Sequence, residues 1–246
     1  MSMGADRNYS DADVAALYDI LNPWAASDDR YLALAMAAPS VLDVGCGTGA
    51  LLRRARADGH TGRLVGVDPD RAVLEVARRT PEIEWVESAA AAMTWDREFD
   101  LAVMMSHAFQ FLITDGDLRA SLTAIRRALL PGGRFVFETR NPAARAWEEW
   151  AAGDSIEVVD PAGRPVRVSY DVLSVDGDVV TLTETTSDSG GTALRVDQAS
   201  LRFLGEHDLT TFLTEAGLVV DDQQGGWHDE PLDETSPEIL TFARRR

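Results

Sequence analysis

Three glycines at alternating positions follow a short apolar segment near residue 40. Residues 41–44 have the composition of a buried strand, and Gly45, Gly47 and Gly49 come directly after them. Glycines at such a turn allow backbone angles that a side chain forbids, and they let a ligand approach the main chain closely. The helix that we expect from Ala50 would direct its free N–H groups at an anionic group of that ligand. An ordinary strand–turn–helix corner, which needs one glycine, is the alternative.

The stretch 41–52 resembles motif I of the class I S-adenosylmethionine (SAM)-dependent methyltransferases, in which an acidic residue precedes G-x-G-x-G. Gly45, Gly47 and Ala50 also satisfy the G-x-G-x-x-G/A pattern of dinucleotide-binding proteins, so an NAD-dependent oxidoreductase is the alternative. Asp43 favours the methyltransferase, because the strand of a dinucleotide-binding motif is normally apolar throughout.

A carboxylate ends the next predicted strand, residues 63–68. Asp68 lies 19 residues after Gly49, at the tip of the strand that should lie beside the first. A carboxylate there can accept hydrogen bonds from both hydroxyl groups of a ribose. Since SAM and NAD both contain that ribose, Asp68 indicates an adenosine ligand without deciding between them.

A helix, a Leu-x-Pro-Gly-Gly turn and an apolar strand follow one another between residues 117 and 137. This order resembles the segment before the fifth strand of class I methyltransferases and is seldom seen in dinucleotide folds. The resemblance covers residues 11–140 and resumes near residue 206. It implies an α/β fold with a Rossmann-like, seven-stranded mixed sheet of order 3-2-1-4-5-7-6, flanked by helices.

Residues 141–204 interrupt this pattern with β-rich runs at 166–172, 179–185 and 194–203, after a helix predicted over 142–151. We expect an antiparallel β insertion after the fifth strand. Several small-molecule methyltransferases, including glycine and amino-sugar N-methyltransferases, carry a sheet in this place. The sheet could instead form a homodimer interface, and the two roles do not exclude each other. The chain then forms one domain, residues 1–246, with N-terminal lid helices at 1–38, a SAM-binding core at 39–140 and 205–246, and the insertion at 141–204.

The resemblance implies which residues hold SAM, whose product after transfer is S-adenosylhomocysteine. They are Tyr18, Asp43, Gly45, Cys46, Gly47, Gly49, Asp68, Pro69, Ala89, Ala90, Met105 and Ser106. The class usually has an aspartate where this chain has Ala89, so we expect a backbone N–H group to reach the adenine, with Met93 packed on its face. Helices predicted over 11–21, capped by Asp11 or Asp13, and over 27–37 should cover the pocket. We expect their aromatic residues Tyr18, Trp24 and Tyr31 to face the ligand. The alternative is that these side chains only pack within the protein.

His107 follows the fourth predicted strand, close to where the transferred methyl group should lie. Histidine changes charge near neutral pH, so His107 is the candidate general base, which is needed when the acceptor must lose a proton. A structural histidine is the alternative. Gln110, Arg140 and Asn141 are candidate substrate contacts at the same sheet edge, and Arg140 suits a carboxylate. The acidic ligands of metal-dependent O-methyltransferases are missing after strands four and five, so we predict no metal.

The amino-acid composition limits the classes of molecule that the protein is expected to bind. The net charge is −18 and all 23 basic residues are arginine, which argues against nucleic acid because phosphate binding needs a basic surface. A run of 18 apolar residues and a signal-peptide pattern are both absent, so we expect no membrane association and a cytoplasmic location. We predict a methyltransferase with a small-molecule N or O acceptor; the alternatives are an NAD-dependent oxidoreductase and a SAM-binding module without catalysis.

Overall fold

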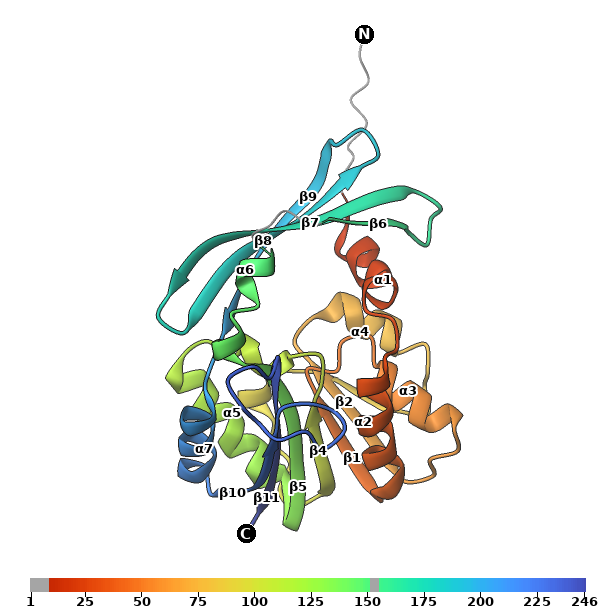
Figure 1. The fold of residues 1–246 in the computed structure, drawn as a ribbon. Helices are drawn as coiled ribbons and strands as arrows, with labels where there is room; N and C mark the ends of the chain where they lie inside the picture. Colours follow the sequence, from red (N-terminus) through yellow and green to blue (C-terminus); the bar gives the residue numbers. More distant parts are fainter. Residues whose placement is uncertain (1–8, 151–154) are drawn as a thin grey trace.

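The computed structural model describes residues 9–150 and 155–246. Its core is a seven-stranded sheet of order β10-β11-β5-β4-β1-β2-β3 (Figure 1). The strands are β1 (Ser40–Val44), β2 (Arg63–Asp68), β3 (Glu84–Glu87), β4 (Phe99–Met104), β5 (Leu129–Arg140), β10 (Leu218–Gln224) and β11 (Glu238–Arg245). Strands β1 to β5 are parallel, and β11 is antiparallel to both of its neighbours. The predicted strand order is confirmed, with β10 and β11 as the sixth and seventh strands of the core.

Helices cover both faces of the core sheet, which explains why its central strands are apolar over most of their length, with Asp43 in β1 and Glu138 in β5 as exceptions. The α-helices are α1 (Asp11–Leu21), α2 (Ala26–Ala37), α3 (Ala50–Ala57), α4 (Arg71–Ala77), α5 (Asp115–Ala128), α6 (Trp147–Trp150) and α7 (Glu206–Glu215). Successive residues of β1 point to opposite faces: Leu42 packs in the cluster with α5 and α7, and Val41 in the cluster with α2 and α3. The N-cap of helix α1 is Ser10, one residue before the expected start, and Asp13 completes a capping box with it; of the two expected capping residues, Asp13 takes part and Asp11 does not.

A second sheet of order β6-β7-β8-β9 follows β5 in the sequence, and all its strand pairs are antiparallel. Its strands are β6 (Ser155–Val159), β7 (Pro165–Asp176), β8 (Val179–Asp188) and β9 (Ala193–Arg202). The short edge strand β6 is absent from the sequence prediction. It is mostly exposed, so it lacks the alternation of buried and polar residues that marks the other three strands.

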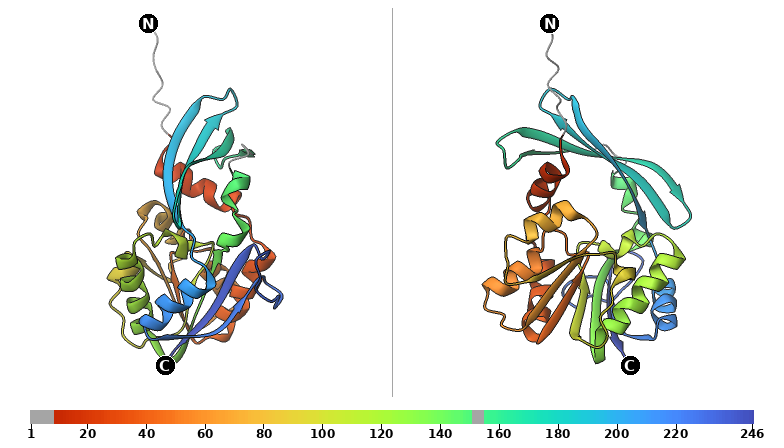
Figure 2. Two further views of the ribbon diagram at one scale, coloured as in Figure 1. Left: turned by 60° about the vertical axis from the view of Figure 1, so that its left-hand side comes forward. Right: turned by 180° about the vertical axis from the view of Figure 1, so that it is seen from behind.

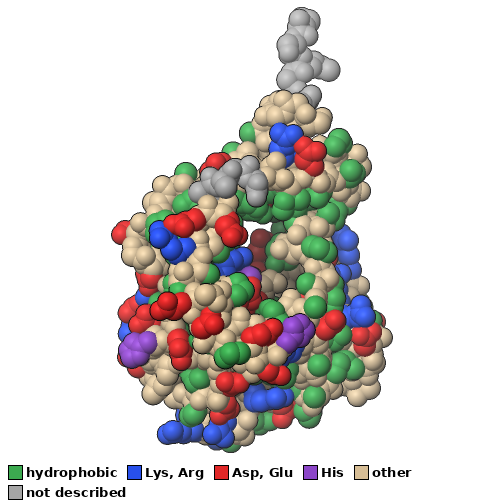
Figure 3. Space-filling view, in the orientation of Figure 1, with side chains coloured by type: hydrophobic (Ala, Val, Ile, Leu, Met, Phe, Trp, Pro, Cys, Tyr) green, Lys and Arg blue, Asp and Glu red, His purple; other side chains and the backbone are tan. Residues whose placement is uncertain are grey.

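The second sheet stands over the carboxyl edge of the core, supported at two places by helices (Figures 1 and 2). On one side Leu17 of α1 packs against Val166 and Val168 of β7. On the other side Trp147 and Trp150 of α6 pack around Phe203, with ring centroids 4.7 and 6.2 Å from it. The space between is hollowed, and Figure 3 shows basic, acidic and histidine side chains on its wall.

The helix predicted over residues 142–151 is broken into two short pieces. A 3-10 turn, η3 (Pro142–Ala144), precedes α6, and Arg145 between them has a positive φ of 51° that a continuous helix does not allow. Residue 151 lies outside the described residues. The break turns α6 toward the second sheet, where its tryptophans form the support described above.

Candidate active site

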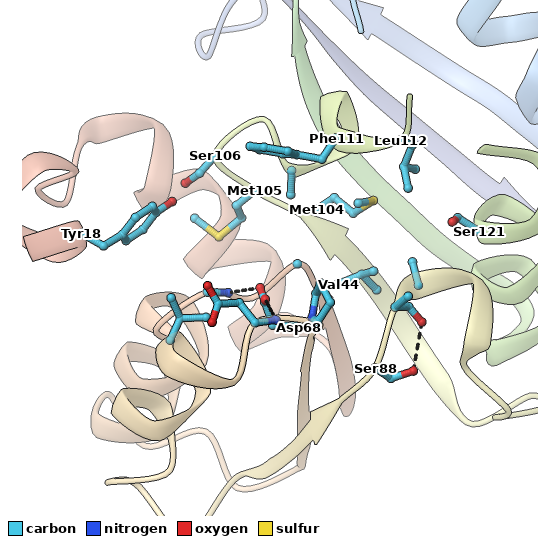
Figure 4. Close-up of a pocket in the computed structure, with 18 of the residues that line it drawn as sticks. Tyr18, Val44, Asp68, Ser88, Met104, Met105, Ser106, Phe111, Leu112 and Ser121 are labelled. Atoms are coloured by element: carbon cyan, nitrogen blue, oxygen red, sulfur yellow. Dashed lines mark hydrogen bonds between the residues drawn. The ribbon is translucent and has the colours of Figure 1, made fainter. Parts of the chain in front are cut away.

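A cavity of about 570 Å³ lies at the carboxyl ends of β1, β2 and β4, under α1 (Figure 4). Nine of the twelve predicted cofactor residues line it: Tyr18, Gly45, Gly47, Asp68, Pro69, Ala89, Ala90, Met105 and Ser106. Asp43, Cys46 and Gly49 are not part of its lining. The carboxyl edge of an open parallel sheet is where such α/β folds bind their ligands.

A glycine is required at each of the three positions 45, 47 and 49, but for different structural reasons. All three have positive φ, but a Cβ at Gly45 would lie 2.8 Å from the Ala108 side chain, and one at Gly49 would lie 2.2 Å from the Trp85 ring. At Gly47 a Cβ would meet no atom closer than the Tyr18 ring, which would lie 3.9 Å away, so there is room beside this residue. Gly47 therefore gives a ligand access to the backbone, whereas Gly45 and Gly49 allow the loop to pack against its neighbours.

Cys46 lies behind this loop, packed with Leu74, Ala77 and Trp85. Burial raises the pKa of its thiol well above the ordinary value, so the reactive thiolate is strongly disfavoured. The side chain packs as a small apolar group and does not line the cavity.

The Asp68 carboxylate is fixed at the end of β2 by two backbone N–H groups. Its Oδ2 accepts from Gly47 N and its Oδ1 from Asp70 N, both at 2.8 Å (Figure 4). Burial raises the pKa of Asp68, and these two hydrogen bonds act in the opposite direction. Each carboxylate oxygen keeps a lone pair for the cavity, which fits the paired hydroxyl groups of a ribose.

Asp43 is 2% exposed at the end of β1, and among the described residues its Oδ1 has no hydrogen-bond partner. Burial and the charges of Asp68 and Glu138 raise its pKa to about 8. A buried carboxylate oxygen without a partner is costly, and a bound cation would relieve that cost. The ammonium group of SAM meets this need, so the residues around the cavity fit SAM.

The aromatic residues expected at the ligand have three different positions. Tyr18 lines the cavity, with its hydroxyl directed toward Ser106 (Figure 4). Trp24 lines a smaller adjoining cavity of about 330 Å³ that shares Tyr18 and Ser106 with the first. Tyr31 is fully buried, and its hydroxyl donates to Glu138. The expectation that Tyr31 faces the ligand was therefore wrong, because α2 turns this side chain into the core.

Met93 is also in the core, where it packs with the sheet and α5. Apolar residues nevertheless border the predicted adenine end of the cavity, among them Val44, Met104 and Leu112. Ala89 and Ala90 lie there as expected, beside the 3-10 turn η1 (Ala90–Ala92). The expectation that Met93 packs on the adenine was therefore wrong, because this side chain is buried in the core and does not line the cavity.

His107 begins the 3-10 turn η2 (Ala108–Phe111) with a left-handed backbone, φ 60°. Its backbone N–H donates to Glu138 Oε1 at 3.0 Å, and its ring Nε2 lies 2.8 Å from Glu238 Oε1. Its neighbours Ser106 and Ala108 line the cavity, whereas His107 is not among the lining residues and its ring is turned toward Glu238. The two glutamates come from β5 and β11 and were not identified in the sequence analysis. The available signal was a carboxylate inside the apolar run of β5 and another at the start of the closing strand.

The pKa values of the two glutamates are shifted in opposite directions. Burial raises the pKa of Glu138, against the opposing effects of His107 and the Tyr31 hydroxyl. Burial also acts on Glu238, but the hydrogen bond with His107 and the charge of Arg140 outweigh it, so the pKa of Glu238 is lowered. Glu238 therefore carries the negative charge that faces the imidazole.

The three predicted substrate contacts separate into two groups. Gln110 is fully buried and holds Arg140: its Oε1 accepts from Arg140 Nη1 at 3.0 Å, and its Nε2 donates to Arg202 O at 3.1 Å. Asn141 uses both amide hydrogens for the carbonyls of Asp233 and Ser236 and accepts from Ala143 N. Its side chain is thus engaged in shaping the loop, whereas the Arg140 guanidinium keeps donors for a ligand.

The described residues contain no group of three or more His, Cys, Asp and Glu side chains arranged to hold a metal ion. Among the helices of the described chain, each is too short or too polar to cross a membrane.

Comparison with known proteins gives the class of this fold and cavity. Residues 41–133 match the family model described as "Methyltransferase domain". The 2-phytyl-1,4-naphtoquinone methyltransferase of Trichormus variabilis is 31% identical over 186 residues, which cover 66% of this chain and 79% of that one. The cypemycin N-terminal methyltransferase of a Streptomyces species is 29% identical over 221 residues, with coverage of 84% and 83%.

Solved structures agree. A SAM-dependent methyltransferase from Clostridium acetobutylicum superposes with a TM-score of 0.74 at 16% identity, covering 94% of this chain and 97% of the other. The chain belongs to the class I SAM-dependent methyltransferases. The family assignment confirms the resemblance found in the sequence, and the NAD-dependent alternative is not retained.

Proposed function

We propose that the protein transfers the methyl group of SAM to the amine nitrogen of a small-molecule acceptor. The observation that carries this proposal is the hydrogen bond between His107 and Glu238. In the sequence, His107 stands between Ser106 and Ala108, which both line the SAM cavity. An amine gains a positive charge when it is methylated, and a histidine held by a carboxylate is suited to remove the proton.

The hollow under the second sheet gives the acceptor a place to bind (Figure 3). It lies between the carboxyl edge of the core and the sheet, flanked by α1 and α6 (Figure 2). Walls on several sides hold two reactants in one orientation and limit the access of water, which is the main contribution that a protein makes to this reaction.

When bound, SAM supplies a methyl group already activated on a sulfonium. The chain's own residues then orient and deprotonate the acceptor. Nε2 of His107 faces the ionised Glu238, so we assign its hydrogen to Nε2 and leave the Nδ1 lone pair free to accept the proton of the amine. Glu238 stabilises the imidazolium that forms, and Glu138 fixes the strained backbone of His107.

Two relatives support nitrogen as the acceptor atom. The cypemycin relative is named as an N-terminal methyltransferase, and a relative from Saccharopolyspora spinosa, 28% identical over 221 residues, is named as an amino-sugar N,N-dimethyltransferase. Both alignments cover 84% of this chain. The quinone methyltransferase alignment covers a smaller share, 66%.

The substitution His107→Ala tests the assignment. We expect turnover with an amine acceptor to fall by about 10²–10⁴, because the general base is lost, while SAM affinity measured by calorimetry stays close to wild type. The variant should also lose the acid limb of the wild-type pH–rate profile. The matched control is His207→Ala, since His207 is exposed on α7, and it should retain activity.

Three results would contradict the proposal in different ways. A His107→Ala variant with wild-type turnover and pH profile would remove His107 from the mechanism. Methylation of quinols or hydroxyl groups, with amines inert, would show that the acceptor atom is wrong. SAM binding without turnover on any acceptor class would favour a binding module that lacks catalysis.

A further inference from the structure

Arg140 is the last residue of β5 and is partly buried, and among the described residues it has no anionic partner within ion-pair distance. Among the described residues its guanidinium makes one side-chain hydrogen bond, from Nη1 to Gln110 Oε1 at 3.0 Å, and no carboxylate lies within ion-pair distance. Its other face lies on the Trp150 ring, 5.0 Å from the centroid. Most of its five N–H donors therefore have no partner in the described structure.

Burial lowers the pKa of Arg140, and the charges of Glu238 and Glu138 oppose that effect. Neither glutamate neutralises it by direct contact, because Glu238 is engaged with His107 and Glu138 with Tyr31. Arginine stays charged in proteins, so this side chain is a partly buried cation whose remaining donors are open to a ligand or to solvent. A guanidinium fork matches the two oxygens of a carboxylate or phosphate, so an anion can pair with these donors.

The fixed position of the guanidinium supports a binding role. Gln110, which holds it, is itself fully buried and anchored to the Arg202 carbonyl at 3.1 Å. Stacking on Trp150 restrains the other side. A side chain held in this way loses little freedom when a ligand binds, which favours affinity.

The missing anion does not belong to SAM. The SAM cavity is lined by residues from α1, β1, β2, β4 and α5 and their loops, together with Arg195 of β9, and Arg140 is not among them. Arg140 instead faces the support formed by α6 and the second sheet, where Trp150 packs with Tyr170 of β7. This is the side on which the proposed function places the acceptor.

The register of the sheet brings the two polar sites together. Arg140 and Glu238 are direct cross-strand partners in the antiparallel pair β5–β11. Cβ atoms of such partners lie about 5 Å apart. The cation of Arg140 and the His107–Glu238 base therefore lie next to each other at one edge of the sheet.

We infer that the acceptor carries an oxyanion group, a carboxylate or a phosphate, close to the methylated nitrogen, and that Arg140 binds this group. This inference rests on the proposed function and narrows its substrate class to amino carboxylates and amino phosphates. Arg140 sets the preference for an anionic acceptor, and His107 with Glu238 receives the amine beside it.

Matched acceptor pairs test the inference. One arm compares small amino acids with their carboxamides, and the other compares phosphoethanolamine with ethanolamine, so that carboxylate and phosphate are distinguished. We expect the wild type to prefer the anionic member of at least one pair by tenfold or more in kcat/KM. Arg140→Gln should reduce that ratio to about one by losing activity on the anionic member alone. Arg140→Lys should keep part of the preference, since it retains the charge without the fork.

A second measurement does not depend on turnover. Inorganic phosphate and propionate carry the anion without an amine, and we expect one of them to bind the wild-type complex with S-adenosylhomocysteine in calorimetry. Arg140→Gln should weaken that binding tenfold or more, with SAM affinity unchanged. The control variant Arg145→Gln removes an exposed arginine that pairs with Glu148, and it should behave as wild type.

The two proposals fail in distinguishable ways. If amines are not methylated but the phosphate or propionate site depends on Arg140, the proposed reaction is wrong and the anion site stands. The inference is overturned if the wild type has equal kcat/KM for charged and neutral acceptors, or if Arg140→Gln lowers activity on both members of a pair equally. It is also overturned if phosphate and propionate bind Arg140→Gln as tightly as they bind the wild type. Should Arg140→Gln fail to fold, the wild-type preference and its reduction in Arg140→Lys decide the question.

Discussion

At the scale of single residues, the site consists of charged groups placed where water is largely excluded. Glu238 holds the ring of His107, Glu138 holds its backbone, and Asp68 is held by two N–H groups of the loops around it. Asp43 differs from these, because its buried Oδ1 has no partner in the described residues. Its charge state is therefore linked to both folding and ligand binding.

Replacement of Asp43 by Asn should change how stability depends on pH. The pKa of Asp43 is raised from 3.8 to about 8, so between these values the native state holds a proton that the unfolded state has lost. The free energy of unfolding of the wild type should then fall with rising pH by up to about 1.4 kcal/mol per pH unit. Asp43→Asn removes this term, so the ligand-free variant should show a flatter profile and exceed wild type near neutral pH.

Urea unfolding between pH 5 and pH 8 without ligand measures this effect. The control Asp58→Asn changes an exposed carboxylate and should leave the slope as in wild type. Equal slopes for Asp43→Asn and wild type would show that Asp43 does not hold the extra proton. In the same variant SAM should bind more weakly, because an amide does not pair with the ammonium group as a carboxylate does.

At the scale of elements, α1 connects the two sheets and closes the SAM cavity. Its Val14 and Tyr18 line the cavity, while Leu17 packs against β7. Two ion pairs, Asp13–Arg164 at 2.5 Å and Asp11–Arg195 at 2.6 Å, join the same helix to the second sheet. These pairs are partly exposed and contribute little, so the apolar contact provides most of the attachment.

Leu17→Ala should loosen α1 from the second sheet. Leu17 is 1% exposed, and truncating a buried leucine costs about 2–5 kcal/mol. We expect faster hydrogen exchange in α1 and faster dissociation of SAM, because Tyr18 lies on the same helix. Ile20→Ala, which truncates a side chain that is 40% exposed on this helix, serves as the control. Unchanged exchange and dissociation in Leu17→Ala would show that α1 is held in place by other contacts.

At the scale of the whole molecule, the net charge of −18 is the main electrostatic feature. An excess of one sign favours solubility but destabilises the compact state through repulsion among like charges. The arginines offset this repulsion locally, as in the pairs of Arg202 with Asp115 and Asp178. The expectation that nucleic acid is not a partner stays a prediction.

Salt should therefore stabilise the protein. Raising the ionic strength from about 0.01 M to about 1 M shortens the Debye length from about 30 Å to about 3 Å and screens the repulsion. We expect the Tm in a calorimetric scan to rise with sodium chloride over this range. A Tm that falls instead would mean that the arginine–carboxylate pairs outweigh the net repulsion.

The sequence by itself determined the fold class and the SAM cavity. Apolar runs of strand length, the glycines after β1 and the carboxylate that ends β2 are local patterns, and each has one favoured structure. The same local reasoning misassigned Tyr31 and Met93, since an aromatic or apolar side chain on a helix or loop carries no signal of which face meets a ligand.

Only the tertiary structure decided the acceptor side of the site. Glu238 is 131 residues from His107 in the sequence, and Glu138 is 31 residues from it, so no spacing pattern links them. The antiparallel return of β11 along β5 places Glu238 opposite Arg140. A shift of that pairing by one residue would turn Glu238 to the other face of the sheet, and register is fixed by the packing of both faces rather than by any local motif.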